Sequence, residues 1–191
     1  MKNTIIFLHG KGHHPSDSIY DVFRSLAVKM NADFLSITAP HPHKNGFRWN
    51  NANKQSSDEA KIEYEKSMTH LKIETEKILA ERKISYNDVI WMGHSQGGDM
   101  AIRMALINGA KRIIVFGADV SRHFQLPVVK KNMSFVIDWI EAGTDIVLND
   151  ERKSSYKVLQ DIGIKVNYIK SKKSEHSNWD LSDITKNILL L

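Results

Sequence analysis

Residues 93–97 have the composition and spacing needed for nucleophilic catalysis. Their sequence, Gly-His-Ser-Gln-Gly, matches the pattern G-x-S-x-G with Ser95 at its centre. The apolar run 88–92 before it predicts a strand, and 100–107 after it predicts a helix. A strand that turns so tightly into a helix strains the serine backbone and exposes its hydroxyl at the positive end of the helix. We therefore predict that Ser95 is a nucleophile.

Two other interpretations fit this turn less well. One is a glycine-rich turn without chemistry, which the strand-to-helix context disfavours. The other is a phosphate-binding loop, but neither Gly-Lys-Ser/Thr nor G-x-G-x-x-G follows the strand. His94, next to the nucleophile, is expected to be structural, because adjacent side chains diverge at such a turn.

A serine hydroxyl needs a base to remove its proton. In the catalytic arrangement built on such a turn, the chain order is serine, carboxylate, histidine. Only His123 and His176 follow Ser95. His176 comes after the last expected strand, whereas His123 follows the fourth strand, too early for this order. We predict that His176 is the general base; the alternative is a surface-loop histidine.

The carboxylate partner must orient the imidazole and stabilise its charged form. Asp145 follows the fifth expected strand after a short Ala-Gly-Thr segment and is our prediction. Asp119, after the fourth strand, is the rival. Asp138 and Glu141 fall within or at the end of a strand, and Asp138 is expected to be a paired buried carboxylate or an edge residue. Asp150 is better placed to cap a helix.

Two backbone N–H groups should stabilise the oxyanion of a tetrahedral intermediate. The residue after the nucleophile, Gln96, supplies one. The loop after the first strand, with the sequence His-Gly-Lys-Gly over 9–12, should supply the other, and we choose Lys11. The alternative for this loop is an ordinary turn between strand and helix.

The long polar loop 40–57 is a candidate for substrate contacts, because loops of this length in compact domains are often functional. Within it, Trp49 and Phe47 are predicted to line the substrate pocket. The competing interpretation is a loop that an aromatic side chain merely anchors.

Five histidines fall in two loops, the loop that begins at residue 9 and the loop 40–57, which raises the question of a metal site. None of them belongs to H-E-x-x-H or a comparable spaced motif, so no metal is expected. They are His9, His13, His14, His41 and His43.

The elements that must position these residues alternate between strands and helices. This alternation predicts a mostly parallel sheet with helices on both faces, whose ligands lie beyond the carboxyl ends of the strands. The long helix over 58–82 should carry a core-facing stripe that includes Ile62, Leu71 and Leu79. The expected strands are 4–8, 33–37, 88–92, 112–116, 134–140 and 165–169, and the other expected helices lie near 19–26, 100–107, 150–160 and 181–190.

Composition narrows the class of protein. The 191 residues are 41% hydrophobic and 26% charged, which suits one globular domain rather than a disordered chain. The absence of cysteine excludes a disulfide scaffold and a thiol nucleophile.

The net charge of +5 is spread along the chain, so no nucleic-acid partner is expected. We find no transmembrane segment and no secretory signal and therefore expect a cytoplasmic location.

With these residues in hand, the chain resembles the phospholipase/carboxylesterase family of α/β-hydrolases, which includes acyl-protein thioesterases. The resemblance rests on Leu-His-Gly-Lys-Gly at 8–12, Gly-His-Ser-Gln-Gly-Gly-Asp-Met-Ala at 93–101, and Gly-Thr-Asp at 143–145 with His176 downstream. It implies a single α/β-hydrolase domain over 1–191. It also implies a triad of Ser95, Asp145 and His176 that acts on small-molecule esters or thioesters without a cofactor.

A second class of function shares the same fold. A binding protein can reuse an α/β-hydrolase scaffold without catalysis, because a fold alone does not establish chemistry. The presence of a serine, an aspartate and a histidine in the required order favours the enzyme.

Overall fold

The computed structural model describes residues 2–51, 58–120, 126–127, 135–143 and 155–189. The predicted acid Asp145 and the alternative base His123 lie outside these residues. Ser95, His176, Lys11 and the other predicted site residues lie within them.

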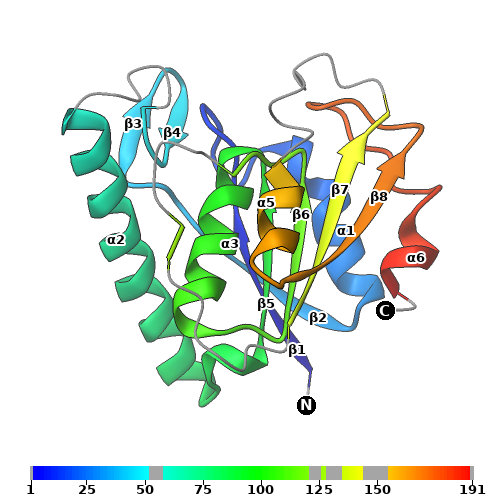
Figure 1. Ribbon diagram of the computed structural model, residues 1–191, viewed down its shortest axis with the longest axis horizontal. Coiled ribbons are helices and arrows are strands. Elements are labelled where there is room, and N and C mark those ends of the chain that lie inside the picture. The colour runs from blue at the N-terminus through cyan, green and yellow to red at the C-terminus, as the bar shows by residue number, and fades with distance from the viewer. Residues whose placement is uncertain (1, 52–57, 121–125, 128–134, 144–154, 190–191) are drawn as a thin grey trace.

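Six parallel strands form one sheet in the order β2-β1-β5-β6-β7-β8 (Figure 1). Leu8 at the end of β1 lies beside Ile37 of β2 and Gly93 of β5, so these strands finish at one edge. Ligands of parallel sheets bind beyond this carboxyl edge. The strands are β1 (Asn3–Leu8), β2 (Ala32–Ile37), β5 (Val89–His94), β6 (Arg112–Phe116), β7 (Val136–Ala142) and β8 (Lys165–Ser171).

Apolar side chains cover both faces of the sheet. Along β1, Ile5 and Phe7 belong to one buried cluster, and Ile6 and Leu8 belong to the other. Successive side chains of a strand point to opposite faces, so a continuous apolar run is what burial on both faces requires.

Helices complete the two buried layers (Figure 1). On the Phe7 face lie α1 (Asp21–Lys29) and α6 (Thr185–Leu189), which bury Phe23 and Ile188 among other side chains. On the opposite face lie α2 (Asp58–Arg82), α3 (Gln96–Asn108) and α5 (Ser155–Asp161). The predicted fold class, a mostly parallel sheet with helices on both faces, is confirmed.

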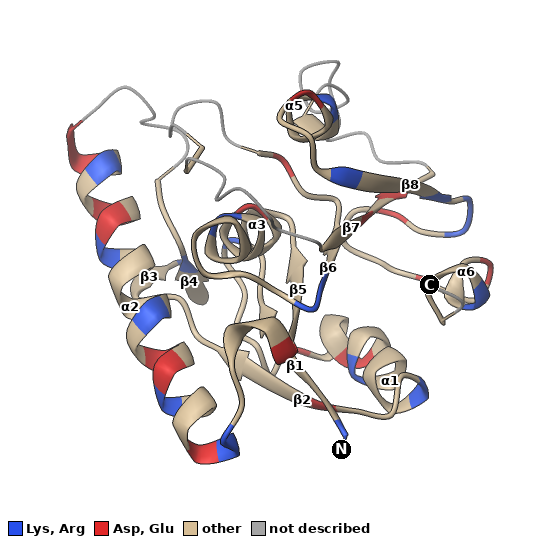
Figure 2. Ribbon diagram, turned by 60° about the horizontal axis from the view of Figure 1, so that its bottom comes forward, with Lys and Arg blue, Asp and Glu red and all other residues tan. Residues whose placement is uncertain are grey.

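Acidic and basic residues recur along the length of helix α2, and several of them pair with each other (Figure 2). Leu71 is fully buried and Leu79 nearly so, as predicted. The prediction for Ile62 is wrong, since 48% of its surface is exposed. Ile62 and Leu71 are nine positions apart, about two and a half helical turns, so their side chains leave opposite sides of the helix.

Several boundaries differ from the sequence prediction. The loop 40–57 contains a two-stranded antiparallel hairpin, β3 (His41–His43) and β4 (Gly46–Arg48), which was not predicted. Its strands contain Pro42 and Gly46, which weaken a strand pattern. Helix α3 begins at Gln96 rather than at 100, because its two glycines obscure the helical pattern.

We expect Leu71→Ala to lower the free energy of unfolding by about 2–5 kcal/mol, because it removes a buried side chain and leaves a cavity. Ile62→Ala on the same helix should change it by less than about 0.5 kcal/mol, because the side chain is half exposed. Urea unfolding of both variants checks this. Equal losses would contradict the assignment of the inner and outer sides of α2.

Candidate active site

Ser95 occupies the turn between β5, which ends at His94, and α3, which begins at Gln96. Its backbone has φ 51° and ψ −121°, a conformation that non-glycine residues rarely adopt. Such a conformation costs about 1–3 kcal/mol and persists only where its surroundings enforce it. Here the Ser95 N–H donates to the carbonyl of Phe116 at 2.8 Å, and the Gly98 N–H donates to the Ser95 carbonyl at 2.9 Å.

The glycines of the pattern allow close contact between backbones. A Cβ on Gly97 would lie 2.2 Å from the carbonyl oxygen of Leu8, at the end of β1. A Cβ on Gly93 would lie 2.5 Å from the carbonyl oxygen of Gly97. Neither position accepts a side chain without a shift of backbone, so the two glycines let α3 start directly against the edge of the sheet.

His176 reaches Ser95 from the loop after β8. Its Nε2 lies 3.2 Å from Ser95 Oγ, within hydrogen-bond reach. The backbones of Glu175 and Asn178 close a tight turn around it with bonds of 2.9 and 3.1 Å. Gly117, at φ +54°, leaves room for the imidazole, because a Cβ there would lie 2.9 Å from His176 Nδ1.

The rival carboxylates have identifiable partners. Glu141 accepts hydrogen bonds from the Trp139 indole at 3.3 Å and from the Tyr168 hydroxyl. Asp119 accepts a hydrogen bond from the Ser155 hydroxyl at 2.7 Å.

Asp138 is a structural carboxylate within β7. It accepts hydrogen bonds from Arg112 at 2.6 Å and from Asn167 at 3.0 Å, and Arg112 also donates to the Ile188 carbonyl. This agrees with the interpretation of Asp138 as a paired buried residue. Asp145, the predicted acid, stays a prediction.

The hairpin β3–β4 holds the loop that contains Lys11. The Gly12 N–H donates to the Phe47 carbonyl at 2.7 Å, and the Phe47 N–H donates to the His13 carbonyl at 3.0 Å. Gly12 has φ +82°, which favours glycine at that position. Gln96 is the first residue of α3, so its N–H has no acceptor within the helix.

His9 connects this loop to the end of β2. A carbonyl can only accept, so the 2.8 Å bond to the Gly10 oxygen places the proton on Nδ1 of His9. The bare Nε2 then accepts the Ala39 N–H at 3.0 Å. Burial lowers the pKa of His9 to about 4, which keeps the ring neutral and this arrangement intact near neutral pH.

The Gln96 side chain holds the loop after β4 by hydrogen bonds, a role that the sequence did not indicate. Its Oε1 accepts the Trp49 N–H at 2.7 Å, and its Nε2 donates to the Asn50 carbonyl and side-chain oxygens, both at 2.9 Å. The Trp49 indole donates to the His9 carbonyl at 2.8 Å.

Trp49 is fully buried, and the hydrogen bonds of its backbone and indole support the interpretation as a loop anchor. Its place in the wall of a substrate pocket stays a prediction. Phe47 is partly buried, with its ring 5.8 Å from that of His14. Its contact with substrate stays a prediction.

The histidines of the loop after β1 and of the loop 40–57 make separate contacts. His13 pairs with Asp17 at 3.3 Å, His14 with Ser16 at 2.6 Å, and His41 with the Glu63 carbonyl at 3.0 Å. Within the described part of the chain, no three His, Asp or Glu side chains are grouped as metal ligands.

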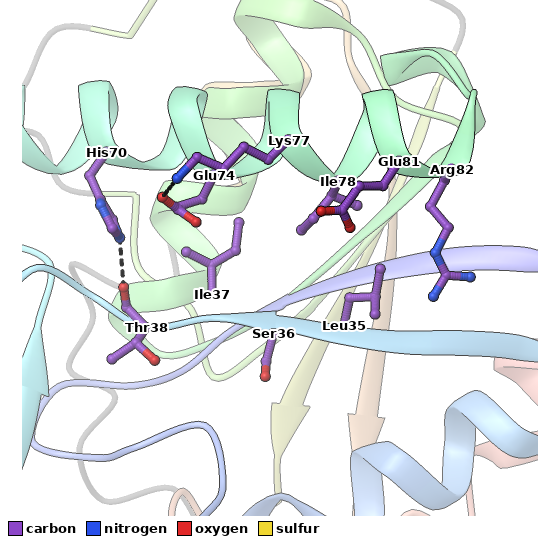
Figure 3. A pocket seen from close by; sticks show the side chains of 10 residues that line it. All are labelled: Leu35, Ser36, Ile37, Thr38, His70, Glu74, Lys77, Ile78, Glu81 and Arg82. Atoms are coloured by element: carbon purple, nitrogen blue, oxygen red, sulfur yellow. Dashed lines mark hydrogen bonds and ion pairs between the residues drawn. The ribbon is translucent and has the colours of Figure 1, made fainter.

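A groove of about 480 Å³ runs between β2 and α2 (Figure 3). Residues 35–38 line one side, and α2 side chains from His70 to Arg82 line the other. Ser95, His176, Lys11 and Gln96 are not among the residues that line it. The groove is therefore separate from the candidate active site.

The fold of this chain is that of an α/β-hydrolase. Esterase PE8 superimposes with a TM-score of 0.78 at 21% identity, over 99% of this chain and 90% of that one. The Bacillus cereus carboxylesterase gives 0.73 at 17% identity, over 97% and 85%. SOBER1 of Arabidopsis thaliana gives 0.73 at 18% identity, over 100% and 97%.

The phospholipase/carboxylesterase family model matches residues 1–188, and the chain belongs to this family. The resemblance inferred from the motifs is thereby confirmed. None of the curated proteins matches the chain significantly. No helix in the described residues is long and apolar enough to cross a membrane.

The buried histidines predict a loss of stability in acid. Burial lowers the pKa of His94 to about 3 and that of His9 to about 4, from an ordinary value of 6.5. Below pH 6.5, these two histidines bind protons in the unfolded chain but stay neutral in the folded chain. Stability should therefore fall as the pH drops from 6.5 toward 4, by up to about 1.4 kcal/mol per pH unit for each ring.

Unfolding by urea between pH 7 and 4 measures this slope. Because carboxylates also titrate in this range, the readout is the difference between the wild type and His9→Gln, which lacks one titrating ring. The variant should show the shallower loss. An identical pH dependence would show that His9 does not contribute.

Proposed function

We propose that the chain is a serine hydrolase of carboxylic esters or thioesters, with Ser95 as nucleophile and His176 as general base. The observation that carries the proposal is the 3.2 Å approach of His176 Nε2 to Ser95 Oγ at a turn with positive φ. Family membership supports the same class of reaction. The proposed substrate is a small-molecule ester or thioester, and no cofactor takes part. The expected cytoplasmic location stays a prediction.

The proposed reaction has two halves. In the first, His176 accepts the Ser95 hydroxyl proton as the oxygen attacks the acyl carbon, and it returns this proton to the leaving alcohol or thiol. In the second, His176 accepts a proton from water, which attacks the acyl-serine ester and releases the carboxylic acid. Ser95 then regains its proton from His176.

Three groups assist these steps in the proposal. The N–H groups of Lys11 and Gln96 donate to the oxyanion of each tetrahedral intermediate. The position of Gln96 at the start of α3 supports its part, because the partial positive charge of the helix end favours a developing anion. Asp145 orients His176 through the second ring nitrogen and stabilises the imidazolium.

Replacement of Ser95 tests the central step. We expect Ser95→Ala to abolish hydrolysis of p-nitrophenyl and thioester substrates and to abolish labelling by a fluorophosphonate probe. Lys11→Ala is the matched control: its effect should be far smaller than the roughly 10²–10³-fold loss that follows removal of an oxyanion donor, because the proposed donor is backbone. Wild-type turnover by Ser95→Ala would refute the mechanism. Probe labelling also separates an enzyme from a non-catalytic protein of the same fold.

Replacement of the acid tests the triad. We expect Asp145→Asn to leave the fold intact and to reduce kcat strongly, by a factor on the order of 10⁴ in the best-studied triad. Asp119→Asn is the comparison, because Asp119 is the rival that follows β6. Circular dichroism verifies that both variants fold. If Asp119→Asn shows the larger loss, Asp119 is the acid.

A further inference from the structure

His94 precedes the nucleophile but lies beneath it, among aromatic rings. Only 1% of its surface is exposed. Its ring centroid lies 5.7 Å from that of Tyr20, 6.1 Å from those of Phe23 and Trp179, and 5.2 Å from that of His176. A ring held on several sides has little freedom to reorient, so its two nitrogens point in defined directions.

The polar contacts of His94 establish which nitrogen carries the proton. Nε2 lies 2.9 Å from the carbonyl oxygen of His176, and a carbonyl only accepts, so Nε2 is the donor. Nδ1 lies 3.5 Å from the Tyr20 hydroxyl, a long contact in which the phenol is the donor. Burial lowers the pKa of His94 and raises that of Tyr20, which keeps both groups neutral near neutral pH.

The same His176 carbonyl receives a second hydrogen bond. The Trp179 indole N–H donates to it at 3.0 Å. Two side-chain donors from different parts of the chain therefore converge on one backbone oxygen, which belongs to the residue whose ring meets Ser95. These bonds fix the position of the His176 backbone, and that position determines how close its side chain comes to Ser95.

Below this turn, the loop is anchored by Ser174. Its buried hydroxyl donates to the Asp180 carbonyl at 2.8 Å and accepts the Asp180 N–H at 3.1 Å. The base of the loop is therefore held separately from its tip. At the tip, His94 and Trp179 both donate to the His176 carbonyl.

On its other side, His94 contacts the loop that contains Lys11. The Gly10 N–H donates to the Tyr20 hydroxyl at 2.9 Å, and a Cβ on Gly10 would lie 2.8 Å from His94 Nδ1. His94 therefore packs directly under the backbone that leads to Lys11. One ring touches the supports of both the proposed base and the proposed oxyanion donor.

We propose that His94 is a positioning residue, which holds the His176 backbone in register with Ser95 through its Nε2–H and links it to the Gly10 loop through Tyr20. This inference rests on the proposed function, since it concerns the base of that reaction. His94 itself exchanges no proton with substrate. It acts by keeping the distance between His176 Nε2 and Ser95 Oγ short.

Two substitutions separate this role from a role in packing. His94→Phe keeps an aromatic ring among its aromatic neighbours but removes the donor. His94→Gln loses the ring contacts but retains an amide donor that can take the place of Nε2–H. We expect His94→Phe to keep a melting temperature near that of the wild type and to lose about 10- to 100-fold in kcat, since a displacement near 1 Å can cost about 10²-fold. Its KM should change by less than about 3-fold.

His94→Gln should show the reverse order: a lower melting temperature, with kcat closer to the wild type than that of His94→Phe. Trp179→Phe, which removes the other donor to the same carbonyl, should also lower kcat with little change in KM. If kcat follows the melting temperature across the three variants, the role is packing alone and the proposal is overturned. Wild-type kcat in His94→Phe would also overturn it.

A readout that does not depend on activity keeps this test separate from that of the proposed function. In ¹⁵N NMR of the wild type, His94 should be the neutral Nε2–H tautomer from pH 8 to pH 5, with a proton on Nε2 protected from exchange by its bond to the His176 carbonyl. An Nδ1–H tautomer or a protonated ring would refute the inference even in a fully active enzyme. Failure of the proposed function would instead appear as an absence of hydrolysis and probe labelling in the wild type.

Discussion

The turn at Ser95 depends on the close approach of α3 to the end of β1. At Gly97, hydrogen occupies a place where a Cβ would stand 2.2 Å from the Leu8 carbonyl, so the first turn of the helix rests on the sheet itself. Two residues before Gly97, the Ser95 backbone adopts a positive φ. The two buried layers on the faces of the sheet enforce this strained conformation. The strands on both sides of β5 are covered by helices.

Around this turn, neutral buried histidines connect loops that are distant in the sequence. His9 joins the end of β1 to the backbone after β2, and His94 joins the end of β5 to the loop after β8. In each ring one nitrogen donates and the other accepts, which only the neutral form allows. The burial that lowers their pKa values also makes an unsatisfied polar group costly, so these bonds are strong constraints on loop position.

Sequence patterns were sufficient for the elements that are uniform in composition. The apolar strand 112–116 and the long helix 58–82 were predicted with the bounds that the structure shows. Hairpin β3–β4 was not predicted, because its strands are three residues long and contain proline or glycine. The start of α3 was missed because glycines, which favour other conformations, occupy its first turn.

For the candidate site, the chain order of residue types predicted the meeting of Ser95 and His176, which lie 81 positions apart in the sequence. The contacts that support these two residues could not be predicted from the sequence. Nothing in the composition of residues 18–20 indicates that Tyr20 accepts the Gly10 N–H, or that the Gln96 amide holds the loop at Trp49. Such contacts depend on how loops from different strands meet at the sheet edge, and no local pattern encodes that meeting.

Trapping the acyl-enzyme tests the proposed reaction most directly. Wild-type protein mixed with p-nitrophenyl acetate is quenched in acid during turnover, digested and mapped by mass spectrometry. If Ser95 is the nucleophile, an acetyl group should appear on the peptide that contains Ser95, attached to that serine, and should disappear once the substrate is exhausted. Acetylation at another residue that rises and falls with turnover, or steady turnover with Ser95 never modified, would contradict the proposed reaction.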